Sequence, residues 1–440
     1  LVRWDQDQIP SSETLGISTL VVPAQNSKAV QGARAQGYRV YLEVEAAALA
    51  TFVPPSPAVA GVLITGNPSD KQLALLRQRL KPSGARALAI RDGAKWPHIR
   101  TNWVTKNREV LQVSSRTAQP WIENNEAWLR IMGSTQRDRP PILTYPWVPI
   151  TLSDTDEGPA LENYLVAIAE AGSFGGDLLL PLHERFQRNL LLGLPQARAE
   201  WNQIRSYLQF YASNLTVHYE PIVDVAVVTA EPMLSFEVMN LLARHNVPFE
   251  LIAPARLPAL DLSRFDLLIA LDAPTAPQVE AMAAFARKGG SVVVTKPADK
   301  APWRSDAPLV TSDERITYEF GEGRVVEALR AIADPNSFAL EVRQLLGRER
   351  RVIDIWNGIT VLTAPYQEPG GGTVLVTVLN YAHQPLPVQL RVRGLFSQVR
   401  YESPEEPTAQ LAYQHRDGYT EFVLPALRIG GRVFLSRNVQ

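Results

Sequence analysis

Short apolar runs alternate with stretches of helical periodicity over about the first 215 residues, and this alternation constrains the fold more than any other feature. Strands rich in Val, Ile and Leu that are separated by helices are typical of a parallel sheet covered on both faces. Eight such runs predict a (β/α)8 barrel over residues 1–218. The runs are Val2–Asp5, Ile17–Pro23, Tyr38–Glu45, Gly61–Asn67, Arg86–Asp92, Glu109–Ser114, Ile142–Trp147 and Asp177–His183.

The segments between these runs are mostly helical in pattern. The predicted helices are Ser69–Leu80, Ala118–Met132, Pro159–Ala171 and Gln196–Ser213. The connection Ala46–Pro57 is too short and too rich in proline for a full helix.

A second α/β unit is predicted over residues 219–340. Its apolar runs alternate with two helices, and the second helix is followed by Gly289-Gly290, a typical C-cap signal. This order predicts a small doubly wound, Rossmann-like domain. The strands are Asp224–Thr229, Phe249–Ile252, Asp266–Ala270 and Ser291–Thr295, and the helices are Met233–His245 and Ala276–Lys288.

Residues 341–440 have a different pattern, in which helices stop after about residue 340. Seven short strands are separated by turn signals such as Trp356-Asn-Gly358 and Asp417-Gly418. They predict an antiparallel β-sandwich. The strands are Arg351–Ile355, Ile359–Ala364, Thr373–Asn380, Val388–Val392, Val399–Glu402, Tyr419–Leu424 and Arg432–Ser436.

Composition excludes several classes of function. Lys and Arg total 44 against 45 Asp and Glu, and no basic run occurs, so we expect no nucleic-acid partner. No apolar run reaches the length of about 18 residues that spans a bilayer, so no membrane partner is expected. The absence of cysteine excludes disulfides, thiolate metal sites and a cysteine nucleophile.

The same absence bears on location. Because oxidising compartments penalise stray thiols, a chain without cysteine favours a secreted or periplasmic protein. A chain that begins at Leu1 fits a removed signal peptide, and it fits equally a chain cut at a domain edge.

Two regions carry a family resemblance. Phe265–Asp272 and Arg287–Val294 resemble the β-galactosidase trimerisation domain, which has an amidotransferase-like fold. Val378–Tyr381 and Asp417–Pro425 resemble the C-terminal sandwich of the same enzymes. The chain therefore resembles the multidomain glycoside hydrolases of family 42, and the resemblance implies a carbohydrate ligand. Amidotransferase chemistry needs a cysteine thiolate, so the middle domain is expected to serve structure or assembly.

The catalytic positions that the resemblance implies are not filled. In this family the acid/base follows strand four as an Asn-Glu pair, and the nucleophilic Glu ends strand seven. Here strand four ends at Asn67-Pro-Ser69, with the Asn but without the Glu, and strand seven ends at Thr144–Val148 without a carboxylate.

Two accounts of the barrel remain open. Either the barrel has lost its catalytic pair, or the pair is drawn from other carboxylates near strand ends, namely Asp5, Glu45, Asp92 and Glu184. Each of these has a structural alternative: Asp5 and Asp92 as loop or cap residues, Glu45 as an N-cap partner, and Glu184 as a surface helix charge.

Aromatic residues indicate the class of ligand. Sugar rings stack on Trp and Tyr, and their hydroxyls hydrogen-bond to amides, carboxylates and imidazoles. The segment Lys95–Trp103 combines both kinds of group. A buried core role is the alternative for each aromatic. The predicted substrate-binding residues are Trp4, Asn67, Trp96, His98, Asn102, Trp103, Tyr145, Trp147 and His183.

No metal or cofactor is expected. The six histidines form no His-x-His and no i,i+4 pair, and Gly321-x-Gly323 fits a turn better than a dinucleotide loop. No Gly-x-Ser-x-Gly motif is present for a serine hydrolase.

The sequence therefore predicts a glycoside hydrolase-like protein that acts on or binds a glycan at the C-terminal face of the barrel. A catalytically inactive protein of the same fold, serving glycan binding or assembly, is the alternative. The helices Met233–His245 and Ala276–Lys288 carry few charges, which favours a homo-oligomer over the alternative of a monomer.

Overall fold

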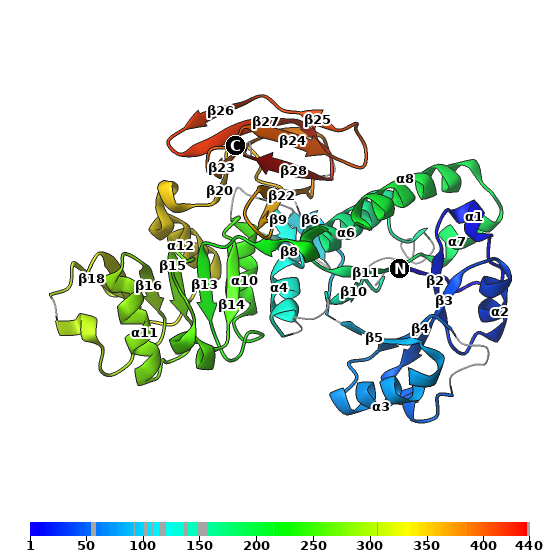
Figure 1. The fold of residues 1–440 in the computed structure, drawn as a ribbon, viewed down its shortest axis with the longest axis horizontal. Coiled ribbons are helices and arrows are strands. Elements are labelled where there is room, and N and C mark those ends of the chain that lie inside the picture. The colour runs from blue at the N-terminus through cyan, green and yellow to red at the C-terminus, as the bar shows by residue number, and fades with distance from the viewer. Residues whose placement is uncertain are drawn as a thin grey trace. The chain divides into compact units, whose positions relative to one another are not determined.

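The computed structural model divides the chain into two compact units, Leu1–Arg100 with Asp138–Leu215, and Thr101–Arg137 with Thr216–Gln440 (Figure 1). It describes residues 1–53, 59–91, 93–100, 104–107, 110–113, 120–135, 140–147, 157–213, 215–305, 307–382 and 384–437.

In its described part, the first unit is a closed barrel of seven parallel strands. An apolar layer fills the barrel, with one side chain from each of six strands: Val21, Tyr41, Leu63, Ile90, Ile142 and Leu179. The predicted parallel barrel is confirmed. Its strands are β1 (Val2–Arg3), β2 (Thr19–Pro23), β3 (Arg39–Glu45), β4 (Gly61–Thr65), β5 (Arg86–Arg91), β10 (Ile142–Thr144) and β11 (Asp177–Pro181).

The sixth of the eight predicted barrel strands was wrong. Within the run Glu109–Ser114, β8 (Val110–Val113) pairs antiparallel with β7 (Val104–Asn107) and belongs to no barrel. An apolar run indicates a strand but not its partner, and a neighbouring strand in the chain can satisfy its backbone groups as a hairpin.

The predicted helix Ala118–Met132 begins too early. A short strand, β9 (Trp121–Glu123), precedes α4 (Glu126–Thr135). The Asn124 side chain accepts a hydrogen bond from the Glu126 backbone N–H at 3.2 Å and so caps the start of the helix.

The predicted barrel helices are otherwise confirmed to within two residues. In α3, Ser69 and Gln72 form a capping box, with the Ser69 hydroxyl accepting from the Gln72 N–H at 3.3 Å. No helix in the described residues is both long and apolar enough to cross a membrane. The elements of this unit outside the barrel are α1 (Ser12–Leu15), α2 (Ser27–Ala35), η1 (Ala46–Ala50), α3 (Asp70–Leu80), η2 (Lys81–Ser83), β6 (His98–Arg100), α6 (Leu161–Ser173), α7 (Glu184–Leu191) and α8 (Pro195–Tyr211). Helix α9 (Leu215–His218) begins at the last residue of this unit and continues into the second.

The second unit contains a seven-stranded sheet in the order β14-β13-β15-β16-β19-β18-β17 (Figure 1). The first five strands are parallel, and β17 and β18 are antiparallel additions. The strands are β13 (Val225–Val228), β14 (Phe249–Ile252), β15 (Leu267–Ala270), β16 (Ser291–Val294), β17 (Val310–Thr311), β18 (Arg315–Phe320) and β19 (Gly323–Ala328).

Apolar cores cover both faces of this sheet, as a doubly wound domain requires. On one face α4, α10 (Phe236–Arg244) and α12 (Pro335–Arg350) pack, and on the other α11 (Ala276–Arg287), η3 (Pro254–Ala259) and η4 (Pro302–Ser305). The predicted Rossmann-like fold is confirmed. Helix α12 extends past residue 340, where helices were expected to stop; Asp334 caps its start and Pro335 is its first residue.

The C-terminal part is an antiparallel sandwich, as predicted. Alternate side chains of both sheets, among them Val376, Leu390 and Phe422, form one core. One sheet contains β12 (Glu220–Pro221), β21 (Val361–Gln367), β22 (Thr373–Asn380), β28 (Gly430–Ser436), β24 (Gln398–Glu402) and β25 (Ala409–Gln410), and the other β20 (Ile353–Ile355), β23 (Leu386–Arg393), β27 (Tyr419–Leu427) and β26 (Tyr413–Arg416).

Candidate functional site

A cavity of about 600 Å³ lies at the carboxyl ends of β1 to β4. Because the strands of the barrel are parallel, their carboxyl ends meet at this one end, where βα-barrels place their chemistry. The cavity is lined by Arg3, Pro23, Ala24, Gln25, Glu43, Val44, Glu45, Ala48, Thr51, Phe52, Val53 and Thr65.

Strand alternation explains why charged side chains enter the barrel here. Tyr41 belongs to the apolar layer, so Glu43 and Glu45, two and four residues further along β3, share its inward face. Leu1 packs against the same layer, and Arg3 and Asp5 follow at the same spacing. The interior of the barrel therefore changes from apolar to charged toward its carboxyl end.

One guanidinium joins two of these carboxylates. Arg3 Nε donates to Glu43 Oε2 at 2.6 Å, and Arg3 Nη2 lies 3.3 Å from Asp5 Oδ1. The three side chains are only partly buried, with exposures of 32% for Arg3, 16% for Glu43 and 33% for Asp5. With Glu45 included, the group carries three formal negative charges against one positive charge.

Helix α7 holds Asp5 in place through hydrogen bonds from and to Gln187. The Asp5 backbone N–H donates to Gln187 Oε1 at 2.9 Å. The buried Gln187 amide in turn donates to the Leu182 carbonyl at 2.7 Å and to Asp5 Oδ2 at 3.5 Å. Because α7 follows directly after β11, the end of one barrel strand is held to the end of another.

An aromatic cluster gathers after the ends of β5 and β10. The ring of Trp96 lies 5.4 Å from that of Tyr145, 6.2 Å from Trp147 and 5.7 Å from Tyr164, measured between ring centroids. Trp96 Nε1 also donates to the Pro146 carbonyl at 3.0 Å. The cluster thus brings together three of the predicted binding aromatics.

Two tyrosines anchor this cluster in the barrel wall. Tyr145 is fully buried, and its hydroxyl donates to Glu170 Oε2 at 2.9 Å. Burial, with Glu170 nearby, raises the pKa of Tyr145 well above its ordinary value. Burial likewise raises the pKa of Tyr164, whose hydroxyl accepts the backbone N–H of His183 at 3.0 Å.

Four further residues that were predicted to bind substrate are Trp4, His98, His183 and Asn67. Trp4 is fully buried, and its Nε1 donates to the Gln8 carbonyl at 2.9 Å. His98 Nδ1 lies 2.9 Å from the Trp96 carbonyl oxygen, and His183 caps α7 by accepting the Arg185 N–H at 3.3 Å. Asn67 is exposed and adopts a positive φ of 50°.

Glu184 is exposed at the start of α7 and lies 3.6 Å from Arg188 on the same helix. Three further predicted residues, Asp92, Asn102 and Trp103, lie outside the described residues.

Sequence reasoning missed Arg3, Glu43, Gln187 and Tyr164. Arg3 and Glu43 carried a usable signal, because each stands two residues before a predicted site residue, Asp5 and Glu45, and therefore on the same strand face. Gln187 and Tyr164 are helical positions whose side-chain contacts depend on tertiary packing, for which the sequence offers no local signal.

An Asn-Glu pair occurs in the second unit. Asn125-Glu126 lies after β9 and not after β4, and Glu126 is the first residue of α4. Glu126 is 2% exposed, and its Oε1 accepts from Arg130 Nε at 3.0 Å and Nη2 at 2.8 Å. Burial raises the pKa of Glu126 against the opposing effect of Arg130. Among the described residues, its Oε2 has no hydrogen-bond partner.

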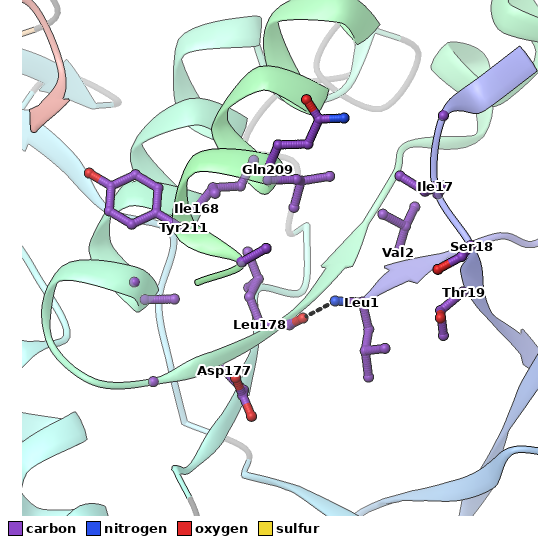
Figure 2. A pocket seen from close by; sticks show the side chains of 16 residues that line it. Leu1, Val2, Ile17, Ser18, Thr19, Ile168, Asp177, Leu178, Gln209 and Tyr211 are labelled. Atoms are coloured by element: carbon purple, nitrogen blue, oxygen red, sulfur yellow. Dashed lines mark hydrogen bonds between the residues drawn. The ribbon is translucent and has the colours of Figure 1, made fainter. Parts of the chain in front are cut away.

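A second cavity, of about 360 Å³, lies at the amino end of the barrel (Figure 2). Strand starts such as Val2 and Leu178 face α6 and α8 there, with Ile168 and Tyr211 on the helix side. The Leu1 amine donates to the Leu178 carbonyl at 2.7 Å. Its lining includes one carboxylate, Asp177, so it lacks the paired acids of the carboxyl-end cavity.

In the described chain, no three His, Cys, Asp or Glu side chains are grouped so that they could hold a metal ion.

No family model and no curated protein matches this sequence. The structure is similar to alpha-L-fucosidase isoenzyme 2 from Paenibacillus thiaminolyticus, with a TM-score of 0.60 and 11% identity over 100% of this chain and 99% of that one. Two β-galactosidases are also similar, each with a TM-score of 0.49. They are the GH42 enzyme Gan42B from G. stearothermophilus (11% identity, 100% and 98% covered) and the enzyme from Bacillus circulans sp. alkalophilus (9%, 99% and 98%). The predicted glycosidase-type architecture is thus confirmed at the level of the fold.

Proposed function

We propose that this protein is a glycoside hydrolase that binds its glycan at the carboxyl end of the barrel. The proposal rests chiefly on Glu43 and Glu45, which line one cavity there together with Arg3. Glycoside hydrolysis needs two carboxyl groups beside the scissile bond. The similarity of the fold to a fucosidase supports the same class of reaction.

We assign an inverting mechanism to the two glutamates. Their Cα atoms are two residues apart on one strand face, about 6.6 Å along the strand. Side chains that leave the strand at this spacing have room for a water between their carboxyl groups, which inverting enzymes need and retaining enzymes do not.

We assign the two roles from the ion pair. Glu43, paired with Arg3, is the carboxylate that takes a proton from the attacking water. Glu45, which has no ion pair within the described residues, gives a proton to the leaving oxygen as the bond from the anomeric carbon to that oxygen breaks. The water oxygen bonds to the anomeric carbon, so each half of the glycan leaves with a hydroxyl and both glutamates exchange their protonation states.

The aromatic cluster supplies the sugar-stacking surface in this proposal. Trp96 and Trp147 are half-buried, so part of each ring remains open to a ligand, whereas Tyr145 is fully buried and positions them. Indole faces bind the apolar C–H faces of pyranose rings.

A screen against aryl glycosides and polysaccharides tests the proposal, followed by NMR of the first product formed. We expect turnover with inverted anomeric configuration. Turnover with retention would overturn the assignment to Glu43 and Glu45, and neither turnover nor glycan binding would overturn the function.

Glycan binding without hydrolysis is the second candidate function, and one observation favours it. Arg3 engages both Asp5 and Glu43, so two of the three carboxylates are already held in ion pairs. Under this alternative the wild-type protein binds a polysaccharide but releases no reducing ends from it.

We further infer a secreted or periplasmic homo-oligomer, supported by the absence of cysteine and by the sparse charge of α11. Every residue of α10 from Val238 to Arg244 is buried, so this helix has little surface for a second subunit. Helix α11 exposes Glu280, Ala284 and Arg287, and we propose that it contacts the partner subunit. Light scattering that returns the monomer mass of 48.8 kDa would contradict the oligomer.

A further inference from the structure

The cavity at the carboxyl end of the barrel has two chemically different parts. The ends of β1 to β4 and the residues beside them contribute its hydrogen-bonding and charged side chains, namely Arg3, Gln25, Glu43, Glu45 and Thr65. The segment of residues 46–53, which we call the apolar wall, contributes Ala48, Thr51, Phe52 and Val53. A ligand that fills this cavity beside the two glutamates therefore also meets the apolar wall.

The sequence of the apolar wall explains its chemistry. Residues 46–50 read Ala-Ala-Ala-Leu-Ala and form η1, and Thr51, Phe52 and Val53 follow. Thr51 has the only hydrogen-bonding side chain of the wall, and its hydroxyl donates to the Ala48 carbonyl at 3.2 Å. The wall therefore has no side-chain donor free for the hydroxyl groups of a ligand.

Contacts from α3 hold the apolar wall in place. Gln72 Nε2 donates to the Ala46 carbonyl at 3.2 Å, and Arg79 Nη1 donates to the Leu49 carbonyl at 3.1 Å. The Leu49 side chain is itself buried. The wall is thus formed before a ligand binds, which lowers the entropy cost of binding.

Two apolar side chains of the wall are open to water. Val53 is 80% exposed and Phe52 is half-buried, and both line the cavity. Covering them with an apolar group of a ligand is favourable, because apolar surface is removed from water. A hydroxyl group in the same place would lose its water without gaining a hydrogen bond from the wall, which is unfavourable. The wall therefore fits an apolar substituent better than a polar one.

We propose that the cavity binds 6-deoxyhexopyranosides, which carry a methyl group at C5 where other hexopyranosides carry a hydroxymethyl group. This methyl group, C6, packs against Phe52 and Val53, and the ring hydroxyls hydrogen-bond to Arg3, Gln25 and Thr65. That the ligand is a glycan rests on the proposed function.

The position of the wall in the chain points to C6. In a pyranose, C5 carries C6 and is joined to the anomeric carbon through the ring oxygen, so C6 lies near the bond that is broken. The wall begins directly after Glu45, the proposed proton donor at that bond. The competing apolar substituent is the methyl of an N-acetyl group at C2, on the other side of the anomeric carbon, and the test separates the two.

The first measurement compares sugars that differ only at C6. Titration calorimetry of the full-length wild-type protein uses L-fucose with L-galactose, L-rhamnose with L-mannose, and D-fucose with D-galactose. Free monosaccharides contain no glycosidic bond, so no probe is consumed. In at least one pair we expect the 6-deoxy sugar to bind about tenfold more tightly, because the extra hydroxyl is desolvated without a partner. Equal affinity within every pair would overturn the inference.

Saturation-transfer difference NMR locates the contact on the sugar. The C6 methyl protons of the bound 6-deoxy sugar should receive the largest transfer. N-acetyl-D-glucosamine with D-glucose is the pair that tests the competing substituent. A preference for the N-acetyl sugar larger than that for any 6-deoxy sugar would contradict the assignment of the wall to C6.

Val53→Asn tests whether the wall causes the preference. The amide removes apolar surface and offers a partner to a C6 hydroxyl, so the preference should fall to about twofold or less. Leu75→Asn is the matched control, because Leu75 is an apolar residue of α3 that is 46% exposed and does not line this cavity. It should keep the full preference. Both positions are exposed, so melting curves of the two variants should coincide with that of the wild type. A preference that survives Val53→Asn would show that the wall is not its cause and would refute the inference.

Hydrolysis of aryl glycosides of the same sugars distinguishes this inference from the proposed function. Turnover without a preference for 6-deoxy sugars would support hydrolysis and refute the specificity. Absence of turnover, with a binding preference that depends on Val53, would refute hydrolysis and support the specificity. If no aryl glycoside is turned over and none of the sugars binds, both are refuted.

Discussion

Two groups of side chains combine arginines with carboxylates, and their surroundings differ. At the carboxyl end of the barrel, Arg3 joins Asp5 and Glu43 beside a cavity, with all three side chains partly exposed. In the second unit, Arg343, Arg351 and Arg391 converge on Asp354, which is 5% exposed.

The two groups differ in burial, and burial determines how much an ion pair contributes to stability. A buried carboxylate must be paired, because its desolvation is otherwise uncompensated, so the Asp354 cluster holds α12 to the sandwich. Charges beside an open cavity gain little stability from pairing, because water screens them. Their placement beside the cavity is the observation on which the proposed ligand site rests.

The largest expected effect is on activity at the barrel. Glu45→Gln should lower kcat about 10²–10⁴-fold, because the amide cannot donate the proton that the leaving oxygen requires. Urea unfolding should show almost no change in stability, since Glu45 is exposed. A Glu45→Gln protein that keeps the activity of the wild type would contradict the assignment of Glu45 as the proton donor.

The next effect is on stability in the second unit. Asp354→Asn should destabilise the protein by about 3–5 kcal/mol, because three guanidinium groups lose their shared counter-charge in a buried setting. Urea unfolding measures the change. A loss below about 1 kcal/mol would show that the cluster behaves like a surface pair.

A smaller, pH-dependent effect is expected at Asp224, at the start of β13. Burial raises the pKa of Asp224 to about 7, although its carboxylate accepts the Val352 N–H at 3.0 Å and lies 3.5 Å from Arg393; Asp266 and Arg351 also act on it. Its unfolded pKa is lower, so the unfolded state releases the proton first. Stability should therefore fall as pH rises from about 4 to about 7.

Asp224→Asn isolates this contribution. The amide cannot ionise, so the decline between these pH values should become shallower by a few kcal/mol in total. Urea unfolding at pH 4.5, 6 and 7.5 compares the variant with the wild type. Parallel curves would mean that another group causes the pH dependence.

The fold was largely predictable because local patterns agree with it. Phe249–Ile252 and Thr373–Asn380 were placed to the residue, since each is an apolar run between clear turn signals. The run at Val110–Val113 was placed in the wrong sheet, because an apolar run does not show which strand it pairs with, and its partner is the neighbouring strand of a hairpin.

The candidate site was less predictable. Glu45 was found because it ends a strand, but Glu43 was passed over, although alternation puts it on the same face. Arg3 became significant only with its two ion pairs, and Trp4 turned out to be buried core. Sequence patterns place a side chain on a face, but they do not show which side chains meet there.

Replacement of Glu184 should give the smallest effect on stability and on kcat. It ends no strand, is exposed on α7 and pairs with Arg188 at 3.6 Å on the same helix. Such i,i+4 pairs contribute about 0.3–0.5 kcal/mol, and salt weakens them. Glu184→Gln should therefore shift urea unfolding by no more than this amount and leave kcat within about twofold of the wild type, in contrast to Glu45→Gln. If Glu184→Gln instead lowers kcat a hundredfold at unchanged stability, the catalytic carboxylate lies at the start of α7 and not on β3.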